Sequence, residues 1–322
     1  MKTDTAPPTS GTSRVTSGAA GTAGATGVRA SPPPTGVTQR KVPRPGAAVV
    51  RRVILYVALI VLAAPFVVPT VWMIASSFKP LSEIFASPPT IFTDSPTWAA
   101  YAEAFTFQPF AQQYFNSVYI AVLVTLITML VSSLAGYAFA RIRFPGRNLL
   151  FLVVLIGLLV PGEVTIVPLF QMFKQVGLIN THWPLILVTA LAAPCVLATF
   201  VMRQFFISLP GELEEAARLD GLGRVGIWWR IFLPLAKPAL SAVAILTFLA
   251  SWNLYLEPTV YLTSPELFTL PQALTRYTDA YGGEMWNTQL AAATMTVVPV
   301  LVVFLIAQKQ FVEGLAHSGL KG

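Results

Sequence analysis

The stretch EEAARLDGLGRVGIWWRIFLPLAKP, residues Glu214–Pro238, decides how the rest of the sequence is interpreted. It holds seven formal charges in a chain of 322 residues that is only 11% charged. Long apolar segments precede and follow it. We therefore expect a polar, helix-forming insert between two segments that cross a lipid bilayer.

The composition indicates an all-α polytopic membrane protein. The chain is 55% hydrophobic, with a mean hydropathy of +0.67, whereas soluble domains have about 25% charged residues. The apolar residues form runs of about 20, enough for a helix of roughly 30 Å, the thickness of a bilayer's hydrocarbon core. Six spans are predicted: Val53–Phe78, Ser117–Ala140, Leu149–Phe170, Pro184–Phe206, Ala239–Leu262 and Gln289–Ala307. Pro161, Glu163 and Pro168 interrupt the third.

The basic residues predict the orientation. Of the 21 Lys and Arg residues, 18 lie in four places: the first 52 residues, the RIRFPGR turn, residues 203–237 and the C-terminal end. Lys79, Lys174 and Arg276 remain on the other side. The positive-inside rule then places both termini and the opening stretch in the cytoplasm. Because anionic lipid headgroups account for this charge, no nucleic-acid partner is expected.

Four regions are predicted along the chain. Residues 1–50, rich in Thr, Ser, Gly, Ala and Pro, form a disordered cytoplasmic tail, and 51–115 hold the first span and an external loop. Residues 116–310 form a core of five spans that includes the polar loop 208–238, and 311–322 form a cytoplasmic C-terminal tail. A cleaved secretory signal is rejected, because the first apolar run starts after residue 52 and is too long.

The polar loop has the signals of a short, well-capped helix. Pro210 suits a first helical turn, and the acidic residues that follow lie at the positive end of the helix dipole. Glu214 and Arg218 have the favourable i,i+4 order. Gly221 or Gly223 supplies the left-handed residue that ends the helix.

A second short helix is predicted directly after the first. Ile227 and Ile231 share one of its faces, Pro234 ends it, and Pro238 starts the fifth span. Two angled helices are therefore expected between the fourth and fifth spans.

The loop contains Glu-Ala-Ala, followed by three residues, a Gly, nine residues and Ile-x-Leu-Pro. This spacing resembles the EAA loop of ABC importer permeases. The resemblance implies that this loop docks on an ATP-binding subunit and transmits its closure to the membrane helices. The residues assigned to this coupling are Glu215, Ala216, Ala217, Asp220, Gly221, Ile231, Leu233 and Pro234.

The resemblance extends from Phe66 to Gly322, through NSVYIAVLVTLITMLVSSLAGYAFARIRFPGR, VPLFQMFKQVGLINTHWPLIL, SWNLYLEPTVYL and GLAHSGLKG. These segments are similar to the carbohydrate, maltose-type branch, which implies the type I ABC importer permease fold. It also implies four kinds of partner: a second permease, two ATP-binding subunits, an extracytoplasmic solute-binding protein and membrane lipid. ATP and Mg²⁺ then belong to the ATPase, and no cofactor is expected on this chain.

An enzymatic function is not expected. The sequence has no P-loop, no Gly-x-Ser-x-Gly elbow and no His-Glu-x-x-His motif. His182, His317 and Cys195 are isolated in the sequence. The alternative is an ion-coupled secondary transporter, which would use intramembrane carboxylates such as Glu163 and Glu257, but it gives the EAA loop no role.

Four residues are predicted to line a polar path for sugar hydroxyls: Glu163, Asn253, Glu257 and Trp252. Carboxylates accept hydrogen bonds from hydroxyls, and an aromatic face stacks on a sugar's C–H surface. The alternative is that the carboxylates lie at the membrane edge or in a subunit interface. The predicted solute is a sugar or oligosaccharide, with a polyol or glycerol phosphate as the alternative.

Overall fold

The computed structural model describes the backbone of residues 45–278 and 281–319, and the side chains of 49–278 and 281–306. The described residues form helices and loops, with one isolated β-bridge between Thr278 and Glu284. The chain divides into two compact units, Met1–Ile60 and Val61–Gly322, and each is described by itself. Most of the tail predicted to be disordered lies outside the described residues, and residues 45–50 are helical.

Helix α1 (Pro45–Ser76) contains the first predicted span. It begins at Pro45, whose fixed φ and missing N–H suit the first helical position, and Pro65 and Pro69 lie inside it. None of its most apolar 18-residue window is buried within the chain. Such a surface is suited to lipid or to another subunit.

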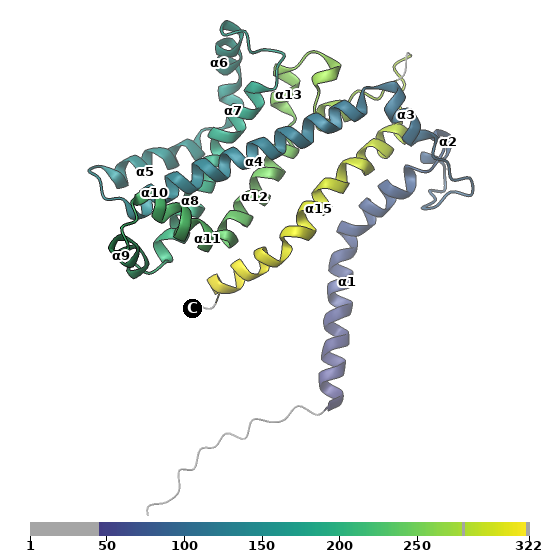
Figure 1. Ribbon diagram of the computed structural model, residues 1–322. Coiled ribbons are helices and arrows are strands. Elements are labelled where there is room, and N and C mark those ends of the chain that lie inside the picture. The colour runs from purple at the N-terminus through teal and green to yellow at the C-terminus, as the bar shows by residue number, and fades with distance from the viewer. Residues whose placement is uncertain (1–44, 279–280, 320–322) are drawn as a thin grey trace, which may run out of the picture. The chain divides into compact units, whose positions relative to one another are not determined.

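The second unit is built around α4 (Phe110–Arg141), which packs most extensively on α8 (Ala193–Ser208) and next on α12 (Lys237–Trp252). Helix α15 (Trp286–Gly319) packs on α12 (Figure 1). Gly136 lets α4 and α8 approach closely, because a Cβ there would meet the Met202 Cβ at 2.7 Å and the Arg203 backbone nitrogen at 2.9 Å.

The third predicted span is broken, as its prolines indicated. Helix α5 (Arg147–Ile156) continues into η1 (Gly157–Leu159), and after Pro161 the chain turns by 95° into α6 (Gly162–Gln175). The fourth span consists of α7 (Trp183–Leu191) and α8, separated at Ala192. Thr128 of α4 donates a hydrogen bond to the Ala190 carbonyl beside this break.

The prediction of one helix over Ala239–Leu262 is wrong. Helix α12 ends at Trp252, and a separate helix α13 (Leu256–Tyr261) follows. Pro258 has no N–H to donate to the Leu254 carbonyl, so the helix cannot continue through this segment. The Asn253 side chain instead donates to the Leu249 carbonyl and closes the last turn of α12.

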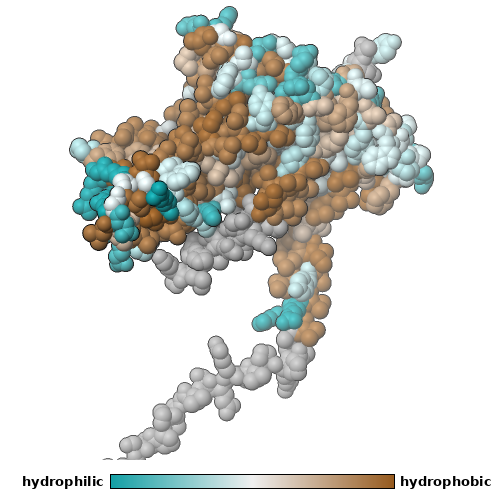
Figure 2. All heavy atoms as spheres, in the orientation of Figure 1, coloured by the Kyte–Doolittle hydropathy of each residue, from teal (hydrophilic) through white to brown (hydrophobic). Residues whose placement is uncertain are grey.

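Short elements form the two ends of this unit. At one end are α9 (Glu212–Leu219), α10 (Arg224–Ile227), the π-helix η2 (Trp228–Phe232) and α11 (Leu233–Leu235). The other short elements are α2 (Leu81–Ile84), α3 (Ala99–Phe107), η3 (Pro265–Leu267) and α14 (Leu270–Leu274). In Figure 2, hydrophilic side chains gather around α9 and at the opposite end, around α2, α6 and α13, with a broad apolar surface between.

Four of the described helical segments are long and apolar enough to cross a membrane: Val49–Ser76, Phe110–Arg141, Trp183–Ser208 and Trp286–Ile306. Two bent pairs raise this number to as many as six, Arg147–Leu159 with Gly162–Gln175 and Arg224–Leu235 with Lys237–Trp252. The fold is therefore that of a multi-pass helical membrane protein.

Candidate functional site: the coupling loop and a polar hollow

We call residues 208–238 the coupling loop. Its first helix, α9, has the three acidic residues Glu212, Glu214 and Glu215 in its first turn and Arg218 in its last, in the order that the helix dipole favours. The predicted i,i+4 pair forms, with Arg218 Nη2 2.5 Å from Glu214 Oε1. The Glu214 side chain is only 12% exposed, whereas that of Arg218 is 57% exposed. Glu215 and Ala216 point away from the core and are exposed.

The end of α9 forms a Schellman motif. Gly221, with φ of +82°, donates its N–H to the Arg218 carbonyl, and the Leu222 N–H reaches back to the Ala217 carbonyl, each at 3.0 Å. These bonds satisfy carbonyls that a helix end leaves free. Gly223 has a φ of −75°, so Gly221 is the left-handed residue of the two that were predicted. Asp220 is the exposed residue just before this turn.

The second helical run of the loop has a buried inner side. Ile227 and Phe232 are fully buried and pack against α4 and α8, where the Phe232 ring lies edge-on to Tyr137 and Phe206, with centroids 5.3 and 5.7 Å away. Ile231 and Leu233 are partly buried against the same cluster. This side attaches the loop to the spans.

The outer side of the coupling loop is apolar and open. Leu219 is 90% exposed, Val225 72% and Trp229 59%. None of the described residues covers them. We call these three residues, together with the exposed Glu215 and Ala216, the outer coupling face.

Pro234 does not end the second helix, contrary to prediction. The helical run continues to Leu235, and the 79° bend into α12 follows at Ala236. Proline lacks an N–H and clashes with the carbonyl four residues earlier. The wider π turn of η2, in which the Leu233 N–H bonds to the Trp228 carbonyl, comes directly before Pro234 and accommodates it.

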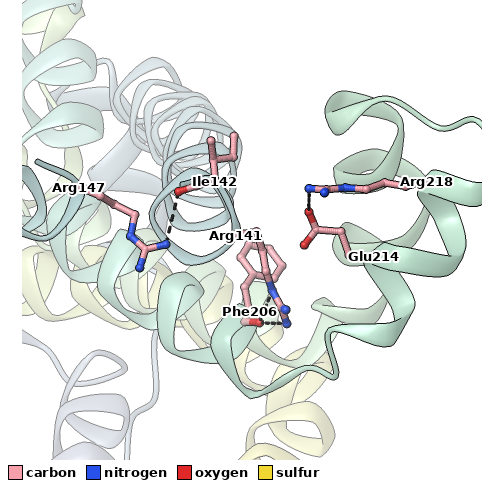
Figure 3. Close-up of polar contacts among 6 residues, drawn as sticks. All are labelled: Arg141, Ile142, Arg147, Phe206, Glu214 and Arg218. Carbon is pink, nitrogen blue, oxygen red and sulfur yellow. Dashed lines mark hydrogen bonds and ion pairs between the residues drawn. The ribbon is translucent and has the colours of Figure 1, made fainter. Parts of the chain in front are cut away.

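Arg141, the last residue of α4, fastens the end of α8 from which the loop starts. Its Nε and Nη2 donate to the Phe206 carbonyl at 3.1 and 2.6 Å (Figure 3). Nη2 also donates to the Leu209 carbonyl. Its guanidinium lies over the Phe232 ring, 5.0 Å from the centroid. Sequence analysis used this arginine only as evidence of orientation, and its position at the end of a long apolar run was the available signal.

The four predicted path residues do not line one common cavity. Trp252 is buried, stacked on Phe248 with centroids 5.5 Å apart. Asn253 is exposed and bonds to its own helix, and Glu163 is exposed in the first turn of α6, beside the 95° bend. Glu257 alone of the four lines a cavity.

That cavity measures about 140 Å³ and lies between α6, the α7–α8 break and α13. Thr165, Thr189 and Tyr261 line it beside Glu257. The Tyr261 side chain is buried, and its hydroxyl has no hydrogen-bond partner among the described residues. A second cavity of about 290 Å³ shares Ala193, Pro194 and Ala250 with the first. Most of the lining of both cavities is apolar. We call the pair the polar hollow after the side chains of Glu257, Thr189 and Tyr261. Its hydroxyl residues were not predicted, because Thr and Tyr are common in apolar spans.

The opposite end of the molecule has a polar network that sequence analysis also missed. Residues 263–270, here called the clasp loop, have their backbone held by side chains from elsewhere in the chain. Asn116 donates to the carbonyls of Glu266 and Phe268 at 2.8 and 3.1 Å, and Ser117 accepts the Leu270 N–H at 2.7 Å. The Asn180 carboxamide accepts the N–H groups of Thr263 and Ser264.

His182 completes the clasp. Its Nε2–H donates to the Leu267 carbonyl at 2.7 Å, which leaves Nδ1 as the acceptor for the Tyr119 hydroxyl. Burial lowers the pKa of His182, and the bond to the Leu267 carbonyl offsets part of that effect. The side chain of His317 lies outside those described. Within the described residues no group of three His, Cys, Asp or Glu side chains could hold a metal ion.

Comparison with known proteins identifies the family of this chain. Residues 129–317, more than half of the chain, match the family described as "binding-protein-dependent transport system inner membrane component". The arabinooligosaccharides transport system permease protein AraQ of Halalkalibacterium halodurans is 40% identical over 259 residues, which cover 80% of this chain and 91% of that protein. The diacetylchitobiose uptake system permease protein NgcG of Streptomyces coelicolor is 35% identical over 261 residues, covering 81% and 86%.

Solved structures have the same fold. A chain of a bacterial ABC transporter involved in the import of the acidic polysaccharide alginate superimposes with a TM-score of 0.72 at 22% identity, over 82% of this chain and 98% of that one. A chain of the alginate transporter in complex with alginate pentasaccharide-bound periplasmic protein gives a TM-score of 0.58 at 16% identity, covering 82% and 96%. This protein therefore belongs to the binding-protein-dependent transport system inner membrane components, as a permease subunit of the carbohydrate ABC importer type.

Proposed function

We propose that this chain is one of two membrane subunits of an ATP-driven importer of sugars or oligosaccharides, and that an ATP-binding subunit docks on its outer coupling face. The observation that carries the proposal is the division of the coupling loop into two sides. The inner side, with Ile227 and Phe232, is anchored to the spans, while Leu219 and Trp229 are apolar and uncovered on the outer side. Monomeric surfaces rarely leave such a patch open without a partner.

We further propose six membrane crossings with both termini in the cytoplasm. Counting each bent pair as one span brings the four long helices to six crossings. The distribution of Lys and Arg supports the orientation. The coupling loop then lies in the cytoplasm, where ATP-binding subunits are found, and the clasp loop faces the outside, where a solute-binding protein would deliver its cargo.

The mechanism that fits this arrangement is alternating access. Two ATP-binding subunits, which would hold ATP and Mg²⁺, close and move the coupling loops of both permeases. The inner side of each loop transmits that movement to α8 and α12, so the shared pore opens outward and receives solute from the binding protein. Hydrolysis on the partner resets it. This requires two alternative packings of the membrane helices whose equilibrium both partners bias.

The path for solute is proposed to follow the polar hollow. Glu257, Thr189 and the unpartnered Tyr261 hydroxyl offer groups that hydrogen-bond to sugar hydroxyls. Glu163 and Asn253 are exposed nearer the ends of their helices, where they can line an approach. Trp252 is packed within the chain's own core, so its ring supports this path least.

A sugar or oligosaccharide is the proposed class of solute, because relatives at 40% and 35% identity are named for arabinooligosaccharides and diacetylchitobiose. A glycerol phosphate is the second candidate, since a relative at 37% identity over 65% of this chain is the sn-glycerol-3-phosphate transport system permease protein UgpE of Yersinia enterocolitica. The ion-coupled alternative is less favoured, because it gives the EAA loop no role.

The test is the double variant Glu215→Lys with Gly221→Pro in the complete importer, co-expressed with its genomic neighbours and reconstituted in proteoliposomes. Lysine reverses a charge on the outer coupling face, and proline cannot adopt the left-handed conformation of Gly221. We expect uptake of the solute that copurifies with the binding protein to be lost, while membrane insertion is unchanged. Glu212→Lys is the matched control, since Glu212 is exposed in the same turn but outside the EAA motif. Normal uptake by the double variant would refute the coupling role.

A further inference from the structure

A basic hollow lies at the turn between α4 and α5, beside the coupling loop. Arg143, Arg147 and Asn148 line a depression of about 350 Å³. The first two residues also line an adjoining groove of about 600 Å³ that extends to Arg224 and to Glu214 and Glu215 of α9. Arg143 and Arg147 therefore lie where the two depressions meet.

The charges that line the groove are not balanced, because five arginines face only the carboxylates of Glu214 and Glu215. The five are Arg141, Arg143, Arg147, Arg218 and Arg224. Arg141 is committed to the carbonyls at the end of α8, and Arg218 is paired with Glu214. Arg143 and Arg224 make no hydrogen bond or ion pair to any residue that the structure describes. Arg147 makes one long bond, 3.4 Å, to the Ile142 carbonyl (Figure 3). Guanidinium groups grouped around one groove repel each other unless an anion lies between them.

The surface next to these arginines is apolar. Leu149 is 68% exposed, and Leu150, Leu152 and Val153 are also exposed on α5. A ligand that occupies the depression therefore meets cationic donors at one end and an open apolar helix along its length. An acidic protein segment would satisfy the arginines but would leave the apolar side uncovered. An anionic phospholipid satisfies both.

We propose that Arg143 and Arg147 bind the phosphate of an anionic phospholipid whose acyl chains lie along α5. Guanidinium groups bind phosphate oxygens through two parallel charge-assisted hydrogen bonds, and basic pockets between membrane helices bind lipid headgroups. Arg224 supplies a third positive charge across the groove. The bound lipid would neutralise the positive charge of the turn between α4 and α5. This turn directly follows Arg141, the residue that fastens the coupling loop.

The experiment measures binding of palmitoyl-oleoyl phosphatidylglycerol to the delipidated complete complex in detergent, by native mass spectrometry and by titrated thermal stabilisation. The Arg143→Gln/Arg147→Gln variant removes two guanidinium groups, each worth about 1 kcal/mol near a membrane surface, so we expect its affinity to fall by roughly 10- to 30-fold. Arg143→Lys/Arg147→Lys keeps the charges but loses the paired guanidinium hydrogen bonds, so its affinity should lie between those of the wild type and of the glutamine variant.

The matched control is Arg51→Gln/Arg52→Gln, which removes the same two charges from exposed positions on α1 that line no described depression. Equal loss of affinity in this control would show that only general surface charge attracts the lipid, and would overturn the proposal. An unchanged affinity in the Arg143→Gln/Arg147→Gln variant would overturn it as well. Unaltered melting in phosphatidylcholine shows that this variant folds.

Two further arms identify the occupant. Inorganic phosphate and phosphatidylcholine at the same concentrations should stabilise the protein much less than phosphatidylglycerol. Equal stabilisation by inorganic phosphate would mean a soluble anion site. Lipid binding that appears only after the ATP-binding subunits are stripped from the complex would mean that a protein segment occupies the groove. Either result contradicts the lipid proposal, and neither depends on uptake activity.

Discussion

The two ends of this permease are held together by different kinds of interaction. The coupling loop is anchored chiefly by apolar packing, in which Ile227 and Phe232 lie against α4 and α8. Arg141 adds a polar connection to the end of α8. The clasp loop is held by hydrogen bonds from polar side chains of α4 and of the loop before α7.

This difference has a mechanical meaning. Apolar contact is non-directional and roughly proportional to area, so one surface can shift on another at moderate cost. Hydrogen bonds weaken steeply when their angles change. We therefore expect the coupling end to move relative to the spans while the clasp loop keeps its shape.

The largest effect is expected from Arg141→Met. The variant loses charge-assisted hydrogen bonds to two carbonyls and the contact with the Phe232 ring, which should lower the free energy of unfolding by about 3 kcal/mol. The melting temperature of the purified complex measures this loss, and uptake should fall with it. Arg230→Met is the control, since Arg230 is exposed and has no hydrogen bond or ion pair in the described part of the chain. Equal melting of the two variants would mean that apolar packing alone holds the coupling loop.

A smaller effect is expected at the clasp from Asn116→Ala. Two carbonyls of the clasp loop lose their partner, at a cost of about 2 kcal/mol for two neutral hydrogen bonds. Melting of the complex reports the change, with Asn253→Ala as the control because that amide bonds only within its own helix. If the bonds that hold the clasp loop act cooperatively, the loss of the Asn116 side chain should increase hydrogen–deuterium exchange throughout residues 263–270. An increase in exchange confined to the residues next to Glu266 or Phe268 would instead indicate that the bonds of the clasp loop act independently.

Local features of the coupling loop could be predicted from the sequence, because a helix start, an i,i+4 pair and a glycine end depend on neighbours within a few residues. The α9 helix and its Gly221 turn follow from the acidic first turn and the glycine. The prediction that Pro210 lies in the first turn is wrong, because Pro210 precedes Gly211, the N-cap of α9. The π turn before Pro234 was not predicted, since proline is ordinarily the signal that ends a helix.

Contacts between distant segments could not be predicted in the same way. Asn116 lies 150 residues before Glu266, and Arg141 lies 65 before Phe206. Each is an ordinary polar residue at the end of an apolar run, and its partner is a backbone carbonyl, which carries no sequence signal. The position of Glu257 could not be predicted either, because Pro258 separates α13 from α12 and Glu257 lines a cavity beside α6.

The smallest effect concerns the pH response of the clasp, through His182. Burial lowers its pKa below the ordinary 6.5, so the unfolded chain takes up a proton at a higher pH than the folded one. Stability is therefore full above pH 6.5 and decreases as the pH falls through that value, levelling off once the folded state is protonated too. Protonation also removes Nδ1 as the acceptor for the Tyr119 hydroxyl. His182→Gln keeps a donor for the Leu267 carbonyl and an acceptor for the Tyr119 hydroxyl but cannot titrate. The melting temperature of this variant should therefore depend less on pH between 5 and 7.5 than that of the wild type. Parallel pH profiles for the two proteins would show that His182 takes up its proton at the same pH in the folded and unfolded states, and that the clasp is insensitive to acid.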